Sequence, residues 1–338
     1  METQQPPIRV AINGFGRIGR TFFRLSQSFP EIEVVAINDL ADAPTLAHLL
    51  KYDSIHGRFN GTVSSTLNDI LVGEERIPVF HEKDPKHLPW SQLKVDIVLE
   101  STGKFKTTAS LHGHLDAGAR RVLLSSPPDD DLIPIIVIGI NDELLSAQQD
   151  IVSNASCTTN NAAPMLQLIQ ELCGINQAYI TTVHSYTTDQ SLHDQPHRDL
   201  RRARAAAQSI VPTTTGAAKA LTSLFPELEK KLGGCGIRVP VPDGSLTDIT
   251  CSVQRPISIQ ELNKAFQQAA LGRWKGIVEY TEDPIVSVDV LHNTHSCVFD
   301  AQLTSVIDTM VKVVGWYDNE TGYSSRLIDL IIKWQQKI

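Results

Sequence analysis

The chain has 338 residues, of which 41% are hydrophobic and 20% charged, and its formal net charge is −8. This length exceeds the roughly 250–300 residues that one hydrophobic core usually serves, so two domains are expected. The acidic balance lacks the broad basic surface of a nucleic-acid-binding protein, and no apolar run reaches the ~18 residues of a membrane span.

The cysteine content also limits the class of protein. There are five cysteines, an odd number, and no C-x-x-C spacing occurs. This pattern disfavours a disulfide framework and a cysteine zinc cluster, so no metal site is expected. The N-terminal stretch METQQPPIRV lacks the basic and apolar regions of a signal peptide. A cytoplasmic, reducing location is expected.

The first half of the chain alternates short apolar runs with helical patterns. The expected strands are IRVAIN (8–13), EVVAIN (33–38), VDIVLE (95–100), RVLLSS (121–126) and IIVIGI (135–140). Such near-continuous apolar runs suit parallel strands that are buried on both faces. Helical spacing occurs between them, in RIGRTFFRLSQSF (17–29) and APTLAHLLK (43–51). The pattern predicts a Rossmann-type, doubly wound parallel sheet over residues 1–156.

A glycine motif follows the first expected strand. Gly14, Gly16 and Gly19 form G-x-G-x-x-G between a strand and a helix. Such glycines allow a tight turn, the close approach of a pyrophosphate, and helix–strand packing, while the helix N-terminus faces the phosphates. Arg17 and Ile18 are expected beside the pyrophosphate, in the first turn of the helix.

An acidic residue after the second strand strengthens this interpretation. Asp39 follows Gly19 by 20 residues, the spacing at which a carboxylate meets the ribose 2′-hydroxyl of NAD. The same carboxylate would repel the 2′-phosphate of NADP. Asp39 could instead cap the next helix. Ser101 and Thr102 follow the strand VDIVLE and are expected to flank the cofactor.

The second half has a different character, with more alternation and more β-branched residues. A helix is expected from Cys157, in CTTNNAAPMLQLIQELCG, and it ends at a glycine. YITTVHSY (179–186), TDITCSVQR (247–255), IVSVDVL (285–291), SCVFDAQL (296–303) and MVKVVGWYD (310–318) are expected strands. They predict an α+β domain with a mixed or antiparallel sheet over residues 157–320. An amphipathic helix, SSRLIDLIIKWQQKI (324–338), closes the chain.

Cys157 is the first candidate for chemistry. It stands at the expected N-terminus of a helix, where negative charge is stabilised and a thiolate is favoured. A buried filler is the alternative, because free cysteines are often buried. His184 ends an apolar strand 27 residues later and is the candidate base. A thiolate–imidazolium pair with a lowered thiol pKa is expected if the two side chains meet.

Six motifs, taken in order, resemble those of phosphorylating glyceraldehyde-3-phosphate dehydrogenases. They are NGFGRIGR, SNASCTTN, HSYTTDQ, RRARAAAQSIVPTTTGAAKA, RVPVPDGSLTD and GWYDNETGYSSR. The resemblance covers residues 8 to about 335. It implies a homotetramer with one NAD per subunit. It also implies that the last helix, within residues 321–338, packs back against the NAD-binding domain.

The resemblance implies specific roles for residues of this sequence. Cys157 would attack glyceraldehyde 3-phosphate and form a thioester, and His184 would act as the base. Inorganic phosphate would then release 1,3-bisphosphoglycerate, a step of glycolysis or gluconeogenesis. Asn319 would hydrogen-bond the nicotinamide carboxamide. The residues implied for the two phosphates are Thr187, Arg202 and Arg238 for the substrate, and Ser156, Thr215 and Gly216 for inorganic phosphate. Thr158 is also implied as a substrate or phosphate residue.

Alternatives remain open from the sequence. The sister family of erythrose-4-phosphate dehydrogenases shares NGFGRIGR and SNASCTTN, but it usually lacks features present here at Tyr186, Thr187 and 215–219. A non-catalytic NAD-binding regulator would not require the cysteine, the histidine and both phosphate groups. The basic run RRAR (201–204) could be a solvated turn or a nucleic-acid patch, and Arg201 competes with Arg202 for the phosphate.

The sequence departs from the family pattern at three places. Asn161 stands where the family usually has a second cysteine, four residues after the nucleophile. SSPPDDD (125–131) replaces a shorter segment that usually lies near the nicotinamide, and Thr321 replaces an aromatic residue. Asn161 excludes a disulfide between that position and Cys157. SSPPDDD and Thr321 are expected to bear on NAD affinity, while neither removes a catalytic group.

Overall fold

The computed structural model describes residues 6–337, which group into two units. Of the described residues, unit 1 comprises 6–136, 142–155 and 324–337, and unit 2 comprises 137–141 and 156–323. Residues 137–141, expected in the first domain, therefore group with unit 2. Among the described residues, no helix is both long enough and apolar enough to cross a membrane.

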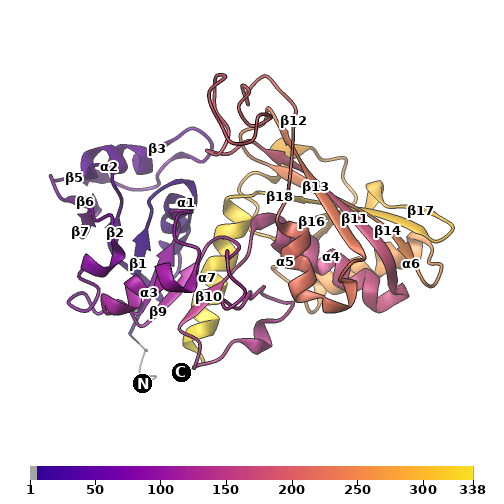
Figure 1. Cartoon of the computed structure of the whole chain (residues 1–338), viewed down its shortest axis with the longest axis horizontal. Helices are drawn as coiled ribbons and strands as arrows, with labels where there is room; N and C mark the ends of the chain where they lie inside the picture. The colour runs from indigo at the N-terminus through magenta and orange to yellow at the C-terminus, as the bar shows by residue number, and fades with distance from the viewer. Residues whose placement is uncertain (1–5, 338) are drawn as a thin grey trace. The chain divides into compact units, whose positions relative to one another are not determined.

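Unit 1 is built on a mainly parallel sheet (Figure 1), with strand order β10-β9-β8-β1-β2-β7-β6-β5. The strands from β10 to β7 pair in parallel, and β6 and β5 continue the sheet in antiparallel fashion. Its strands are β1 (Ile8–Asn13), β2 (Ile32–Asn38), β5 (Val63–Ser65), β6 (Asp69–Val72), β7 (Glu75–Phe80), β8 (Ile97–Glu100), β9 (Arg121–Leu124) and β10 (Ile151–Ser153), while β3 (Tyr52–Asp53) and β4 (Gly57–Arg58) form a separate ribbon.

Helices cover this sheet because its strands are apolar on both faces. They are α1 (Arg17–Ser26), α2 (Ala43–Lys51) and α3 (Thr108–Asp116), with short 3₁₀ turns at Pro85–His87 and Asp142–Leu144. The side chain of Asp42 caps α2 by accepting from the Thr45 N–H at 2.8 Å, and Pro44 sits in its first turn. Trp90 and Val98 lie in a core cluster of the sheet, and both are fully buried.

One expected strand of unit 1 is wrong. IIVIGI (135–140) is not a strand, because only Ile135 bridges to Ser153 and the chain then turns. The Asn141 side chain accepts the Val137 N–H at 2.8 Å, and Gly139 has a φ of +81°. The parallel strand at this edge is instead β10, in the stretch just before the cysteine helix.

The C-terminal helix α7 (Thr321–Gln335) completes unit 1 from Ser324 onward. The guanidinium of Arg121, at the start of β9, donates to the Trp334 carbonyl at 3.1 Å and lies over the Trp334 ring. Lys333 pairs with Asp142. The expected return of this helix to the NAD-binding domain is confirmed, although Ile338 lies outside the described residues.

Unit 2 holds a mixed sheet with strand order β12-β13-β11-β14-β18-β16-β15, and β17 pairs with β18. The pairs β11–β13 and β15–β16 are parallel and the others antiparallel. Its strands are β11 (Ile175–Ser185), β12 (Val211–Thr213), β13 (Leu232–Val239), β14 (Ser245–Val253), β15 (Val278–Thr281), β16 (Cys297–Asp300), β17 (Ser305–Ile307) and β18 (Met310–Tyr317). The expected mixed α+β class is confirmed.

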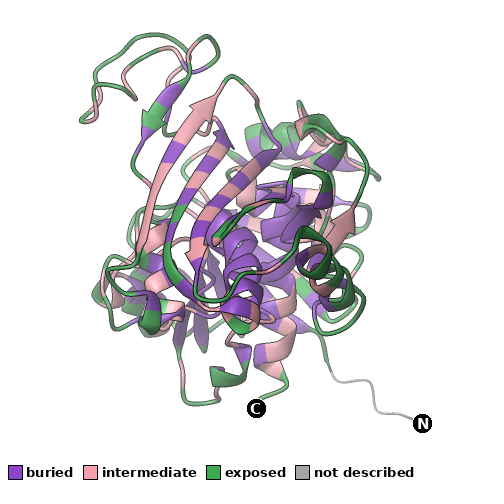
Figure 2. Ribbon diagram, turned by 90° about the vertical axis from the view of Figure 1, so that its right-hand side faces the viewer, coloured by how far each residue is buried: buried purple, intermediate pink, exposed green. Residues whose placement is uncertain are grey.

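Helices α4 (Cys157–Cys173), α5 (Ala217–Leu224) and α6 (Ile259–Leu271) pack on this sheet, with 3₁₀ turns at Pro226–Leu228, Ser287–Val290 and Ala301–Leu303. The side chains of β14 alternate between buried and half-buried along the whole strand. Figure 2 shows such purple and pink bands on strands of the chain. The expected strand IVSVDVL (285–291) is wrong. The Asp289 carboxylate accepts the Val286 N–H at 2.7 Å and closes a 3₁₀ turn there instead.

Candidate active site

The cysteine of SNASCTTN is the first residue of α4. Just before it, Ala155 has a φ of +55°, a conformation that non-glycine residues rarely adopt. Ser156 caps the helix by accepting the Thr159 N–H at 3.1 Å. This tight turn presents Cys157 at the positive end of a 17-residue helix, where developing negative charge on sulfur is stabilised.

A histidine from the neighbouring sheet reaches this sulfur. His184, near the end of β11, places its Nε2 atom 3.4 Å from Cys157 Sγ and is only 5% exposed. The parallel register of β11 and β13 puts Arg238 directly beside it. Arg238 Nη1 lies 2.6 Å from His184 Nδ1 and also donates to the Ser185 carbonyl at 3.0 Å. Helix, sheet and register thus bring together a nucleophile, a base and a cation.

Burial of this pair acts against the charged forms of both side chains. Burial raises the pKa of the Cys157 thiol to about 11, although the charge of Arg238 opposes the shift. Burial, and then Arg238, lower the pKa of His184 to about 3. Both shifts favour a neutral thiol beside a neutral imidazole in the free site. The thiolate–imidazolium pair expected from the sequence stays a prediction.

The residues expected for the substrate phosphate, Arg238, Arg202 and Thr187, come from β13, from the loop before β12 and from just after the end of β11. Arg238 lies beside His184. Burial is the main cause that lowers the pKa of Arg238, and the positive charge of Arg202 lowers it further. Arg202 also pairs with Asp189 and donates to the Thr214 carbonyl at 3.5 Å. Thr187 follows β11 and is held through its N–H by Gln190. The charges of Arg202 and Arg238 thus interact electrostatically.

The residues expected for inorganic phosphate lie at two helix N-termini. Ser156 caps α4, and Gly216 precedes α5 with open space where a Cβ would stand. The Thr215 hydroxyl accepts the Ala217 N–H at 3.2 Å. The hydroxyl of Thr158 lies 3.0 Å from the Tyr317 hydroxyl and is therefore engaged within the protein.

Sequence reasoning assigned no role to Tyr317. Its hydroxyl lies 3.0 Å from both Thr158 Oγ1 and Thr182 Oγ1, and its ring meets the His184 ring edge-on. Burial raises the pKa of Tyr317, so it stays a neutral wall of the site. The signal was present in the sequence, because Tyr317 stands two residues before Asn319 in the motif GWYDNETGYSSR.

Asn319 is held firmly from one side. Its Oδ1 accepts from the Ser185 hydroxyl at 2.9 Å and from the Ser245 hydroxyl at 2.7 Å. Any contact with a nicotinamide must therefore come from the Nδ2 amide. The departure at Asn161 has its own role: its Nδ2 donates to the carbonyls of Ser296 and Trp316, both at 3.2 Å.

The glycine motif of unit 1 has the shape that a dinucleotide requires. Gly14 has a φ of +94°, and a Cβ there would lie 2.7 Å from the Thr102 nitrogen. A Cβ on Gly19 would lie 2.3 Å from the Gly14 carbonyl oxygen, so this glycine permits helix–strand packing. Gly16 is exposed at the N-terminus of α1, with nothing within 4 Å of its missing side chain. A pyrophosphate fits these features.

The other residues expected at the cofactor also lie at this edge of the sheet. The Asp39 carboxylate accepts the N–H groups of Phe15 at 2.8 Å and Ala41 at 3.0 Å, which fixes it after β2. Arg17 pairs with Asp53, and Ile18 is half-buried beside it in the helix. The Ser101 hydroxyl donates to the Gly14 carbonyl at 2.7 Å, so it holds the glycine loop.

The segment SSPPDDD contributes to unit 1 through an aspartate. Asp130 accepts the Thr108 N–H at 2.6 Å and its hydroxyl at 3.0 Å, at the N-terminus of α3. Thr107 caps the same helix. The segment SSPPDDD therefore places the negative charge of Asp130 at the N-terminus of α3, where the helix dipole favours it.

Comparison with known proteins decides the family. The family model described as "Glyceraldehyde 3-phosphate dehydrogenase, NAD binding domain" matches residues 8–108, and the model of the C-terminal domain matches residues 156–319. The chain belongs to the glyceraldehyde-3-phosphate dehydrogenase family. The resemblance seen in the six motifs is thereby confirmed. Members of this family are NAD-dependent oxidoreductases that act on an aldehyde, and unit 1 contains the NAD-binding domain.

Curated relatives match along nearly their full length. The glyceraldehyde-3-phosphate dehydrogenase of Mycobacterium avium is 52% identical over 331 residues, which cover 96% of this chain and 97% of the relative. Glyceraldehyde-3-phosphate dehydrogenase 2 of Streptomyces avermitilis is 51% identical over 328 residues, covering 96% and 98%. The enzyme of Mycolicibacterium smegmatis is 51% identical over 332 residues, covering 96% and 97%.

Proposed function

We propose that the protein oxidises D-glyceraldehyde 3-phosphate with NAD and inorganic phosphate, forming 1,3-bisphosphoglycerate through a thioester on Cys157. The observation that carries this proposal is the 3.4 Å contact between Cys157 Sγ and His184 Nε2, with Arg238 alongside. Such a set serves covalent catalysis on a phosphorylated aldehyde. It places the protein in glycolysis or gluconeogenesis.

The chemistry assigned to each residue follows from its contacts. As Cys157 attacks the aldehyde carbon, its proton passes to His184 Nε2, which then donates to the new oxyanion. His184 next removes the hydroxyl proton of the hemithioacetal. NAD bound at the glycine motif would supply the hydride acceptor that this oxidation needs. The thioester that remains is attacked by inorganic phosphate. The acyl phosphate leaves, and the sulfur regains its proton.

Two anion groups complete the proposal. Arg238 and Arg202, with Thr187, bind the phosphate of the substrate, because guanidinium groups match phosphate oxygens in charge and geometry. Arg202 is preferred to Arg201, which is exposed. Ser156, Thr215 and Gly216 receive inorganic phosphate with hydroxyl and backbone N–H donors. Thr158 can contribute only its backbone N–H, because its hydroxyl is engaged with Tyr317. Asn319 orients the nicotinamide, and Asp39 selects NAD over NADP.

Copies of the chain assemble as a homotetramer in this proposal. Tyr179 in β11 is 51% exposed, and Met310 in β18 is 45% exposed, although both belong to the central sheet of unit 2. In β14, which lies between β11 and β18, half-buried side chains alternate with buried ones. A sheet face of this kind suits burial against a second copy. The five free cysteines are consistent with a reducing compartment such as the cytoplasm.

The test is steady-state formation of NADH with two sugars at several phosphate concentrations. Glyceraldehyde 3-phosphate should have a much higher kcat/KM than erythrose 4-phosphate. Turnover should depend steeply on phosphate, and arsenate should replace it. Oxidation that ignores phosphate and prefers erythrose 4-phosphate would transfer the protein to the sister activity. Binding of NAD without oxidation of either sugar would indicate a regulator.

A further inference from the structure

A row of buried polar side chains crosses the carboxyl edge of the unit 1 sheet. Asn13 ends β1, Asn38 ends β2 and Glu100 ends β8, and these three strands are neighbours in the sheet. All three residues are at most 5% exposed. Burying a polar group costs free energy unless the group is hydrogen-bonded, so each of these side chains needs a partner within the protein.

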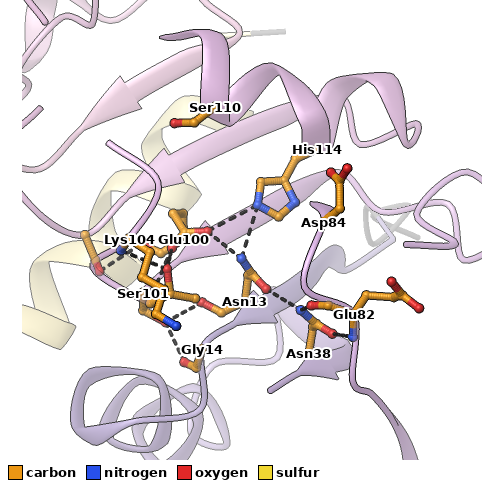
Figure 3. A network of polar contacts seen from close by, with 12 residues as sticks. Asn13, Gly14, Asn38, Glu82, Asp84, Glu100, Ser101, Lys104, Ser110 and His114 are labelled. Atoms are coloured by element: carbon orange, nitrogen blue, oxygen red, sulfur yellow. Dashed lines mark hydrogen bonds and ion pairs between the residues drawn. The ribbon is translucent and has the colours of Figure 1, made fainter. Parts of the chain in front are cut away.

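The row is continuous (Figure 3). The Glu82 N–H, from the loop after β7, donates to Asn38 Oδ1 at 2.9 Å. Asn38 Nδ2 donates to Asn13 Oδ1 at 2.7 Å, and Asn13 Nδ2 donates to Glu100 Oε2 at 2.5 Å. Side chains thus join the ends of three adjacent strands, and a backbone N–H from the loop after β7 extends the row to a fourth strand.

Glu100 is the centre of this network. Its Oε1 accepts the Thr102 N–H at 2.8 Å and also the Thr102 hydroxyl. Its Oε2 lies 3.2 Å from His114 Nε2. Trp90 Nε1 donates to His114 Nδ1 at 3.0 Å, so that nitrogen carries no proton. With Nδ1 as the acceptor, Nε2 is the ring nitrogen that donates to Glu100, and it also lies 3.3 Å from Asn13 Nδ2.

The members of the row stand directly before cofactor residues in the sequence. Asn13 precedes Gly14, Asn38 precedes Asp39, and Glu100 precedes Ser101. The loops that follow are also in contact, since a Cβ on Gly14 would lie 2.7 Å from the Thr102 nitrogen. A shift at one strand end would therefore move the residues that bind the dinucleotide.

We propose that a strand-end network sets the three NAD-binding loops in their binding arrangement before the cofactor arrives. We define the strand-end network as Asn13, Asn38, Glu100 and His114. They are positioning residues, because their hydrogen bonds fix the strand ends from which the cofactor residues follow. Order that is already present in the free protein need not be created on binding, and this raises affinity. The inference concerns NAD binding alone and does not depend on which aldehyde is oxidised.

The test compares Glu100→Gln and His114→Phe with a control in the same unit. Glu100→Gln replaces a carboxylate that accepts four hydrogen bonds by an amide with a single acceptor oxygen. His114→Phe removes one of the donors to Glu100 and leaves the Trp90 N–H without its acceptor. Arg121→Gln is the control, because Arg121 is buried at the opposite, amino end of β9 and bonds the Trp334 carbonyl. His114→Gln keeps a donor and an acceptor and should restore much of the lost affinity.

Three measurements separate positioning from simple packing. The Kd for NAD is measured by titration, and amide hydrogen exchange is followed over residues 13–19 and 100–103 in the NAD-free protein. kcat is taken at saturating NAD. Glu100→Gln and His114→Phe should each weaken NAD binding by roughly tenfold and speed exchange in both loops, with kcat within about twofold of the parent. Arg121→Gln should lower the thermal midpoint and leave the Kd for NAD unchanged.

A purely structural network would give another result. The thermal midpoint would fall in Glu100→Gln and His114→Phe as it does in Arg121→Gln, while the Kd for NAD stayed within twofold of the parent. That outcome overturns the proposal. If Glu100→Gln does not fold, His114→Phe and its restoration by His114→Gln decide by the same criterion. Loss of aldehyde oxidation with normal NAD binding would count against the proposed function instead.

Discussion

At the scale of single residues, Cys157 and His184 divide the chemistry between a helix and a strand. The thiol stands at the N-terminus of α4, and the imidazole comes from β11 at a distance of 3.4 Å. Burial of both groups favours their neutral forms. The helix N-terminus and Arg238 are therefore most useful once charge develops on sulfur and on the substrate, as in electrostatic catalysis generally.

Replacement of the nucleophile tests its role directly. Cys157→Ser should lower kcat by about a thousandfold or more, because a serine hydroxyl is a far weaker nucleophile than a thiol with the same base. NAD binding should be retained, since the glycine motif lies in unit 1. Cys235→Ser, a change at a half-buried cysteine in β13, is the control. Turnover in Cys157→Ser close to that of the parent would refute the assignment.

The buried histidine should leave a mark on acid stability. Burial lowers the pKa of His184 to about 3, against about 6.5 in an unfolded chain. Between these two values the unfolded state binds one more proton at this site, so stability falls as the pH falls from 6.5 towards 3. The loss amounts to at most about 1.4 kcal/mol per pH unit.

His184→Gln should therefore flatten the acid side of the stability curve. Denaturant unfolding measured at half-unit steps from pH 7 to pH 4 gives the slope, and the exposed His193→Gln serves as the matched control. The parent and His193→Gln should lose stability more steeply than His184→Gln. Equal slopes in all three proteins would show that the imidazole is not held neutral by its burial.

At the scale of elements, sequence pattern predicted α1, α2, α4 and α7, but it did not predict α3, α5 or α6. The stretch 43–51 has helical spacing, an aspartate before it and a proline in its first turn, and α2 covers those residues. The two failed strands, 135–140 and 285–291, are apolar runs whose backbone is turned by a nearby side chain, from Asn141 in one and Asp289 in the other. Apolar content alone does not distinguish a strand from a buried turn.

The site could be predicted only in part for a related reason. Cys157 and His184 stand out through their motifs, and the resemblance supplied the phosphate residues. The strand-end network is held by pairs such as Asn13 and Glu100, which are 87 residues apart. No local pattern reports such a pair, and only the parallel register of β1 and β8 brings the two strand ends together.

Asn161 makes a prediction at the element scale. It lies in α4, and its Nδ2 ties that helix to the carbonyls of Ser296 and Trp316, next to β16 and within β18. Asn161→Cys would introduce the cysteine usual in the family and leave two buried carbonyls without this donor. We expect a loss of about 1–3 kcal/mol in stability, seen as a lower thermal midpoint, with activity kept at low temperature.

The control for this change is Asn263→Ala in α6, whose side chain donates to a single carbonyl, that of Ala301. It should lower the thermal midpoint by less than Asn161→Cys does. An unchanged midpoint in Asn161→Cys would mean that the amide does not support the packing of α4.

At the scale of the whole molecule, the proposed tetramer requires that exposed parts of the unit 2 sheet be covered by other copies. Tyr179 in β11 and Thr250 in β14 are opposite each other in the antiparallel pair, so they mark one spot on this face. Charged groups are unfavourable in the dry centre of an oligomer interface, because the charge loses its hydration without gaining a partner. The mass of the assembly is therefore sensitive to charge at this spot.

Tyr179→Asp and Thr250→Asp, combined in one chain, should shift the mass measured by light scattering from four chains towards two or one. Leu271→Asp is the matched control, since Leu271 is 78% exposed at the end of α6 and away from these strands in the sequence. It should leave the mass at four chains. Circular dichroism of the double variant checks that the subunit remains folded, because both side chains point away from the buried face of their strands. A folded double variant that stays tetrameric would place the interface elsewhere, and a parent that is monomeric at micromolar concentration would remove the tetramer from the proposal.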